Sequence, residues 1–232
     1  MITLAELVVK GRKKIVYEGI YELPEAASFL RTSMSFPSNI KITSSKLIYW
    51  IRQGLSLQEL TKIHGREMLI AFEDLISMRI IASLRASGVS FNKIYAAEKW
   101  LRETTKHPRP FATQALWTEK SEVFTELQFR LITASKHGQY AMDIIREYLI
   151  PIHGLTFDES GIAETWEPYK NIVLRPQIQF GSPCIKGTRI PTRTIWGMVI
   201  GGDTIDFIAS SYKLDASEIE AAVEWERTLI PN

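Results

Sequence analysis

The feature that most constrains this chain is the segment 43–53, which reads TSSKLIYWIRQ. Its apolar residues recur at helical spacing and predict one buried stripe, formed by Leu47, Ile48 and Ile51. Polar side chains point the other way, namely Ser45, Lys46, Tyr49 and Gln53, with Arg52 on the flank. Thr43 or Ser44 can cap the helix by accepting a backbone N–H bond, and Gly54 ends it. A capped helix with hydroxyls, an amide and a cation predicts a reader of the DNA major groove.

The surrounding segments predict a winged helix-turn-helix. A first helix is expected over 24–30, because Pro24 suits a first helical turn and alanines and leucine follow at buried spacing. A turn region over 33–42 then leads into the reading helix. The segment 57–72 predicts a β-hairpin that turns near His64 and Gly65, which would form a wing beside the helix.

Cations dominate this region. Between residues 40 and 66 the basic side chains are Lys41, Lys46, Arg52, Lys62 and Arg66, and the acidic one is Glu59. Such a surplus favours contact with phosphate groups. The net charge of the whole chain is only +2, but residues 1–105 carry 15 Lys and Arg against 10 Asp and Glu, whereas residues 106–232 carry 13 against 16. This asymmetry predicts a half that faces nucleic acid and a half with another task.

We expect a mainly helical protein with some β-structure, in three parts. Residues 1–105 would form the DNA-binding domain, which opens with a basic arm or hairpin over 8–17 and closes with helices over 73–87 and 90–103. Residues 106–175 would form a mixed connecting region that could support dimerisation, with extended segments over 111–129, a helix over 138–149 and a strand over 172–174. Residues 176–232 would form a three-helix module. Within it, a strand over 178–180 and a turn-rich segment over 181–192 come before the helices.

Helix signals define that last module. The first helix would run to Gly201 and Gly202, and Asp203 would cap the second, which ends near Ser210. Asp215 with Glu218 three residues later predicts a capping box at the start of the third. Seven acids lie between 203 and 232 against Lys213 and Arg227, so this surface would repel DNA and suits dimerisation or protein contact better. A small basic cluster, Lys186, Arg189 and Arg193, is either a secondary anion site or a solvated loop whose arginines pair with local acids.

Catalytic and cofactor chemistry finds little support. The four histidines, His64, His107, His137 and His153, match no metal-ligand spacing, and Cys184 is expected to be a packed apolar residue. The glycines near 181–187 lack a phosphate-binding ending. We therefore expect no metal, no cofactor and no enzyme activity. The absence of a signal peptide and of a long apolar run predicts a cytoplasmic protein without a membrane partner.

Two stretches resemble known families. The segments 21–27 and 44–50, together with 73–76 and 84–94, resemble the winged helix-turn-helix of MerR-type regulators. The segments 180–183 and 187–192 resemble the signature of an antitoxin-associated domain of unknown function (DUF433 family). Together the chain resembles a VapB-type antitoxin with a MerR-like N-terminal domain.

This resemblance implies a homodimer that represses its own operon at operator DNA and neutralises a PIN-like ribonuclease toxin. Ser44, Ser45, Lys46 and Tyr49 would face bases, and Arg52, Lys62, His64 and Arg66 would hold the backbone. Two alternatives stay open, a regulator that senses a small ligand in the 106–180 region and a protein-interaction module that binds no DNA. Separately from these alternatives, the segment 43–53 can also be interpreted as an ordinary amphipathic surface helix.

Overall fold

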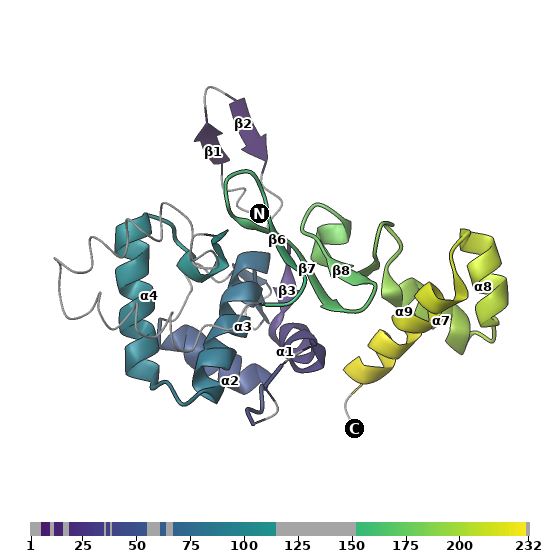
Figure 1. The fold of residues 1–232 in the computed structure, drawn as a ribbon, viewed down its shortest axis with the longest axis horizontal. Coiled ribbons are helices and arrows are strands. Elements are labelled where there is room, and N and C mark those ends of the chain that lie inside the picture. Colours follow the sequence, from purple (N-terminus) through teal and green to yellow (C-terminus); the bar gives the residue numbers. More distant parts are fainter. Residues whose placement is uncertain are drawn as a thin grey trace.

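A computed structural model describes residues 6–9, 12–15, 19–34, 36–37, 39–54, 61–63, 67–114 and 152–230. Within these ranges the protein is mainly helical and carries small antiparallel sheets (Figure 1). Strands β1 (Glu6–Val9) and β2 (Arg12–Ile15) pair as an antiparallel ribbon, which agrees with the hairpin alternative for the N-terminal segment. No helix in the part of the chain that the structure describes is long and apolar enough to cross a membrane.

The N-terminal helices enclose a compact apolar core. β3 (Tyr21–Glu22) leads directly into α1 (Leu23–Thr32), whose first turn contains Pro24. α2 (Ser44–Arg52) packs against α1, and α3 (Phe72–Ala86) and α4 (Phe91–Thr105) complete the cluster (Figure 1). β4 (Thr61–Ile63) and β5 (Glu67–Ile70) pair antiparallel, and β5 also pairs with β3, so a three-stranded sheet lies beside the helices in the order β3-β5-β4.

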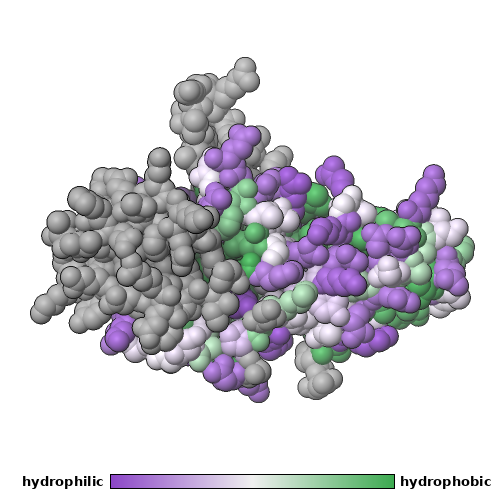
Figure 2. All heavy atoms as spheres, in the orientation of Figure 1, coloured by the Kyte–Doolittle hydropathy of each residue, from purple (hydrophilic) through white to green (hydrophobic). Residues whose placement is uncertain are grey.

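A second sheet lies between the N-terminal and the C-terminal helices (Figure 1). β6 (Leu155–Phe157), β7 (Ala163–Tyr169), β8 (Ile172–Leu174) and β9 (Cys184–Ile185) form an antiparallel sheet in sequence order. Because β9 pairs with β8, the sheet crosses the boundary expected at 175–176. α7 (Thr192–Ile200), α8 (Ile205–Tyr212) and α9 (Ala216–Leu229) follow, as expected for a three-helix module. Hydrophobic residues reach the surface over α7 and α8, at the right-hand end in Figure 2.

Several expectations for local structure are wrong or fall elsewhere. Residues 178–180 do not form a strand, because Gln179 and Phe180 adopt left-handed backbone angles in the 3₁₀ turn η3 (Gln179–Gly181). A second 3₁₀ turn, η1 (Pro110–Ala112), occupies the start of the segment expected to be extended. The remainder of that segment from 115 onward and the helix expected over 138–149 lie outside the described residues.

Helix caps follow the sequence more closely. The Thr43 hydroxyl accepts a bond from the Lys46 backbone N–H at 3.2 Å, as predicted. The Glu218 carboxylate accepts from the Asp215 backbone N–H at 2.9 Å, as a capping box requires. Thr204 rather than Asp203 caps α8, because its hydroxyl accepts from the Phe207 N–H at 3.2 Å. Asp203 lies one residue outside the cap.

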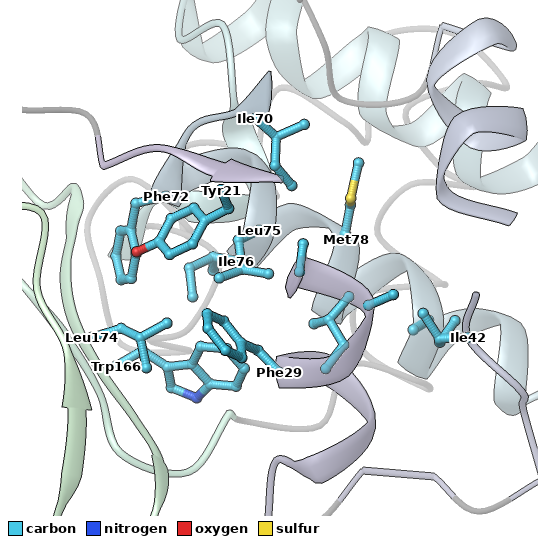
Figure 3. Close-up of a cluster of buried hydrophobic side chains, with 14 of the residues drawn as sticks. Tyr21, Phe29, Ile42, Ile70, Phe72, Leu75, Ile76, Met78, Trp166 and Leu174 are labelled. Atoms are coloured by element: carbon cyan, nitrogen blue, oxygen red, sulfur yellow. The ribbon is translucent and has the colours of Figure 1, made fainter. Parts of the chain in front are cut away.

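Helix α1 joins the two halves through aromatic packing. Phe29 lies 5.6 Å from Trp225 of α9, measured between ring centroids, and 6.1 Å edge-on from Tyr21. Figure 3 shows Phe29 pointing toward Trp166 and Leu174 of the second sheet, with Tyr21 and Phe72 above it. All of these side chains are at most 2 % exposed. Their burial removes large apolar areas from water, which is the main source of stability at this junction.

One hydrogen bond and one glycine define the same junction. The buried Tyr21 hydroxyl donates to the Gly181 carbonyl at 3.0 Å. Gly181 has φ of +88°, and a Cβ there would lie 2.2 Å from the Tyr21 hydroxyl oxygen. Desolvation raises the pKa of Tyr21 well above its ordinary value, so the phenol stays protonated and donates at neutral pH. Only glycine allows the turn and the tyrosine to approach this closely.

A buried ion pair fixes the other side of the N-terminal core. Asp74 at the start of α3 accepts from Arg109 Nε at 2.7 Å and Nη2 at 3.2 Å, and from the Ala71 backbone N–H at 3.1 Å. Burial raises the pKa of Asp74, and the Arg109 charge and these hydrogen bonds oppose that shift. The pair therefore holds η1 against α3.

The Gly181→Ala substitution should destabilise the protein by about 2–4 kcal/mol, because it adds both a clash and left-handed strain. Tyr21→Phe should cost about 1–3 kcal/mol, because the Gly181 carbonyl loses its buried donor. The double variant should lose less than the sum of the two, since removing the hydroxyl also removes the nearest clash. Urea unfolding measures all three, and strict additivity would contradict the contact.

The Arg109→Met substitution should destabilise the protein by about 3–5 kcal/mol at pH 7, because Asp74 then stays buried without that cation. The pKa of Asp74 should rise further, so the native state binds the proton more tightly than the unfolded state. The free energy of unfolding of the variant should therefore recover as pH falls from the raised pKa toward the ordinary value of 3.8. Urea titrations of both proteins at several pH values test this, and parallel pH profiles would contradict it.

Candidate nucleic-acid interface on helix α2

The inward face of α2 explains how the helix is held. Leu47, Trp50 and Ile51 are buried, and they lie three and four residues apart along one side of the helix. This differs from the expected stripe, in which Ile48 took the place of Trp50. Because a helix turns by about 100° per residue, Ile48 falls at the edge of the buried face and is only half-buried. The larger indole fills the core instead.

The outward face of α2 brings four predicted residues together. Ser45, Tyr49, Arg52 and Gln53 are exposed along the side opposite the buried stripe. Arg52 is therefore on this face rather than on its flank, because it lies three residues after Tyr49. Ser44 and Lys46 are half-buried, and Lys46 Nζ donates to the Lys41 carbonyl at 2.9 Å beside the helix start. The helix thus presents hydroxyls, an amide and two cations on connected surface.

Sequence reasoning missed a group of aromatic side chains that borders this face. The Tyr49 ring lies 5.9 Å from the ring of Phe91 at the start of α4. Tyr95, one turn further along α4, is 39 % exposed and approaches Gly54, where an added Cβ would lie 3.3 Å from its ring. Phe91 and Tyr95 are four residues apart and therefore lie on the same side of a polar helix. That spacing was the sequence signal for an aromatic group. The Phe91 ring supports Tyr49, which remains 54 % exposed.

The hairpin residues expected to contact phosphate are only partly described. Lys62 belongs to β4, where it is paired with Met68 of β5. His64 and Arg66 lie outside the described residues. The pairing of β4 with β5 and of β5 with β3 places this hairpin in the same sheet as the strand that begins α1. The sheet thereby ties the hairpin to the α1–α2 pair.

The second basic cluster is partly neutralised. Lys186 Nζ forms an ion pair with Glu167 Oε2 at 2.6 Å, whereas the alternative of a locally paired loop expected such pairs for the arginines. Arg189 and Arg193 are exposed, and Arg193 lies in the first turn of α7. Lys186 is therefore less available to an external anion than the two arginines.

No group of three or more histidine, cysteine or acidic residues suited to a metal ion occurs in the described ranges. Cys184 is buried in β9, and burial raises the pKa of its thiol to about 11. The thiol therefore stays protonated at neutral pH and packs as an apolar residue.

The chain is similar to known proteins over part or most of its length. Residues 172–225 match the family described as "Protein of unknown function (DUF433)", which spans β8 to α9. A Mycobacterium tuberculosis protein named "Putative antitoxin VapB45" is 22% identical over 177 residues, covering 69% of this chain and 72% of its own length. The crystal structure of Rv2018 from Mycobacterium tuberculosis matches with a TM-score of 0.64 at 19% identity, covering 88% of this chain and 96% of that one. The fold is thus shared with Rv2018 over most of both chains, and the C-terminal segment is similar to DUF433.

Proposed function

We propose that this protein is a DNA-binding antitoxin that represses its own operon and neutralises a co-encoded ribonuclease toxin with a PIN-like fold. In this proposal α1, α2 and the β4–β5 hairpin act as a MerR-like winged helix-turn-helix. The observation that carries the proposal is the outward face of α2, where Ser45, Tyr49, Arg52 and Gln53 are exposed together on a helix anchored from its other side.

The chemistry of this face suits a base-reading surface. Arg52 can donate two parallel hydrogen bonds to guanine, and Gln53 can pair with adenine. Tyr49 offers a flat, supported ring for apolar contact with thymine methyl groups or sugars. Lys46, close to the helix start, can contact a phosphate together with Lys62, His64 and Arg66 of the hairpin. Phosphate contacts supply affinity, and the α2 face supplies the choice of sequence.

The antitoxin role is supported by the C-terminal segment. Its similarity to DUF433 and the name of the VapB45 relative favour a toxin partner. The helices α7 to α9 carry most of the acidic residues of this segment, which disfavours a second DNA-binding surface there. We therefore assign DNA binding to the N-terminal helices and contact with proteins to the C-terminal part. A homodimer would place two reading helices on a symmetric operator.

The Lys46→Ala and Arg52→Ala double variant should abolish specific binding to the DNA upstream of its own gene, and Arg52→Ala alone should cost about 1–3 kcal/mol. Fluorescence anisotropy with labelled promoter DNA at two salt concentrations measures the affinity and shows how many phosphate groups the variant no longer neutralises. Lys170→Ala, an exposed lysine between β7 and β8, is the matched control and should bind like the wild type. Unchanged affinity in the double variant with intact helicity would contradict the proposal.

Co-expression with the adjacent open reading frame tests the antitoxin role separately. We expect that gene to encode a small ribonuclease whose expression stops growth, and we expect this chain to restore it. The double variant at Lys46 and Arg52 should still restore growth from an unrelated promoter, because toxin contact uses other surfaces. Failure of the wild-type chain to restore growth would refute neutralisation while leaving DNA binding intact.

A further inference from the structure

Helix α7 carries an outward stripe that the described part of the chain leaves uncovered. Arg193, Trp196, Gly197 and Ile200 follow one another at spacings of three, one and three residues, and Thr192 and Ile195 are the buried residues of the same helix. Ile200 is 67 % exposed and Trp196 is half-buried. The neighbouring helix α8 also exposes a large apolar side chain, Phe207, which is 56 % exposed. Large apolar side chains exposed together indicate an interaction surface.

Gly197 lies at the centre of this stripe. A glycine inside a helix weakens it relative to alanine. Gly197 has ordinary helical angles, and a Cβ added there would meet nothing within 4 Å among the described residues. This differs from Gly181, which the contact with Tyr21 requires. The missing side chain at Gly197 therefore leaves room for another backbone to approach from outside.

The charges at the two ends of the stripe have opposite signs. Arg193 is exposed in the first turn of α7, and Asp203 is exposed just beyond its last residue, with Asp206 nearby on α8. If two copies of α7 cross antiparallel at Gly197, each residue faces the one equally far on the other side of that glycine. Arg193 of one copy then faces Gly201 of the other, two residues before the exposed Asp203. The stripe is thus complementary to itself, as a two-fold interface requires.

We propose that α7 is the interface of a two-fold symmetric homodimer, in which the helices cross at Gly197. Trp196 and Ile200 form its apolar centre, and Arg193 pairs with Asp203 of the second copy at both ends. A second copy fits better than a uniformly cationic partner, because such a partner would meet the exposed Arg193. This names the surface for the homodimer expected under the proposed function, and its test uses no DNA.

Sedimentation equilibrium of the full chain at micromolar concentrations tests the interface. The wild type should be a dimer, and Gly197→Gln should be monomeric with unchanged helical circular dichroism, because its side chain points outward and glutamine suits a helix. Ser217→Gln, at an exposed position of α9, is the matched control and should remain dimeric. A monomeric wild type, or a dimeric Gly197→Gln variant, would overturn the proposal.

A charge exchange makes the test specific for the arrangement. Arg193→Glu and Asp203→Arg should each weaken the dimer by at least tenfold in dissociation constant, because each places like charges opposite one another. The variant carrying both changes should regain most of the lost affinity. Desolvation raises the pKa of Glu25 of α1 and the Arg193 charge opposes that shift, so Arg193→Glu also disturbs its own chain. Mixing the Arg193→Glu and Asp203→Arg variants should yield a heterodimer, because opposite charges then face each other at both ends of the interface. No recovery of affinity in the double variant or in the mixture would overturn the pairing.

Discussion

Helix α1 is buried from two sides, and the placement of α2 relative to the C-terminal helices depends on that packing. On one side it supports α2, whose Leu47, Trp50 and Ile51 are buried against the N-terminal core. On the other side Phe29 packs against Trp225 of α9 and close to the second sheet. The hydrogen bond from Tyr21 to the Gly181 carbonyl lies at the same junction. Since both contacts belong to β3 and α1, a shift of α1 would move the α2 face relative to α7.

This connection has a consequence for function. A dimer formed through α7 would fix the relative position of the two α2 faces. Within each copy the connection runs through buried contacts between α9 and Phe29 of α1. Side chains packed this densely transmit displacement rather than absorb it. A protein bound near α7 to α9 could then alter DNA affinity without touching the reading helix. Under the proposed function, such coupling would link DNA affinity to the binding of a protein partner.

Local signals predicted the helices well. The Thr43 cap, the glycine after α2 and the Asp215–Glu218 pair each depend on neighbouring residues, so their geometry could be read from the sequence. Whether Trp50 or Ile48 enters the core depends on how α2 is rotated against α1. The spacing of apolar residues predicts that rotation only to within one residue. The exposure of Arg52 follows from the same rotation.

Long-range contacts could not be predicted in this way. Strands β6 to β9 are short, and their pairing crosses the boundary drawn from helix signals. Neither Gln179 nor Phe180 favours left-handed angles, so the turn that replaces the expected strand is explained by Gly181 and its contact with Tyr21, 160 residues earlier. Likewise, Phe91 supports Tyr49 from a separate helix. In each case the deciding partner lies far away in sequence.

The most direct test of the central claim is a map of the backbone amides that respond when promoter DNA is added to the isotope-labelled protein. We expect the largest NMR chemical shift changes to fall on residues 44–53 and on the β4–β5 hairpin, with little change along α9. Shift changes concentrated on α7 to α9, or none at saturating DNA, would contradict the claim.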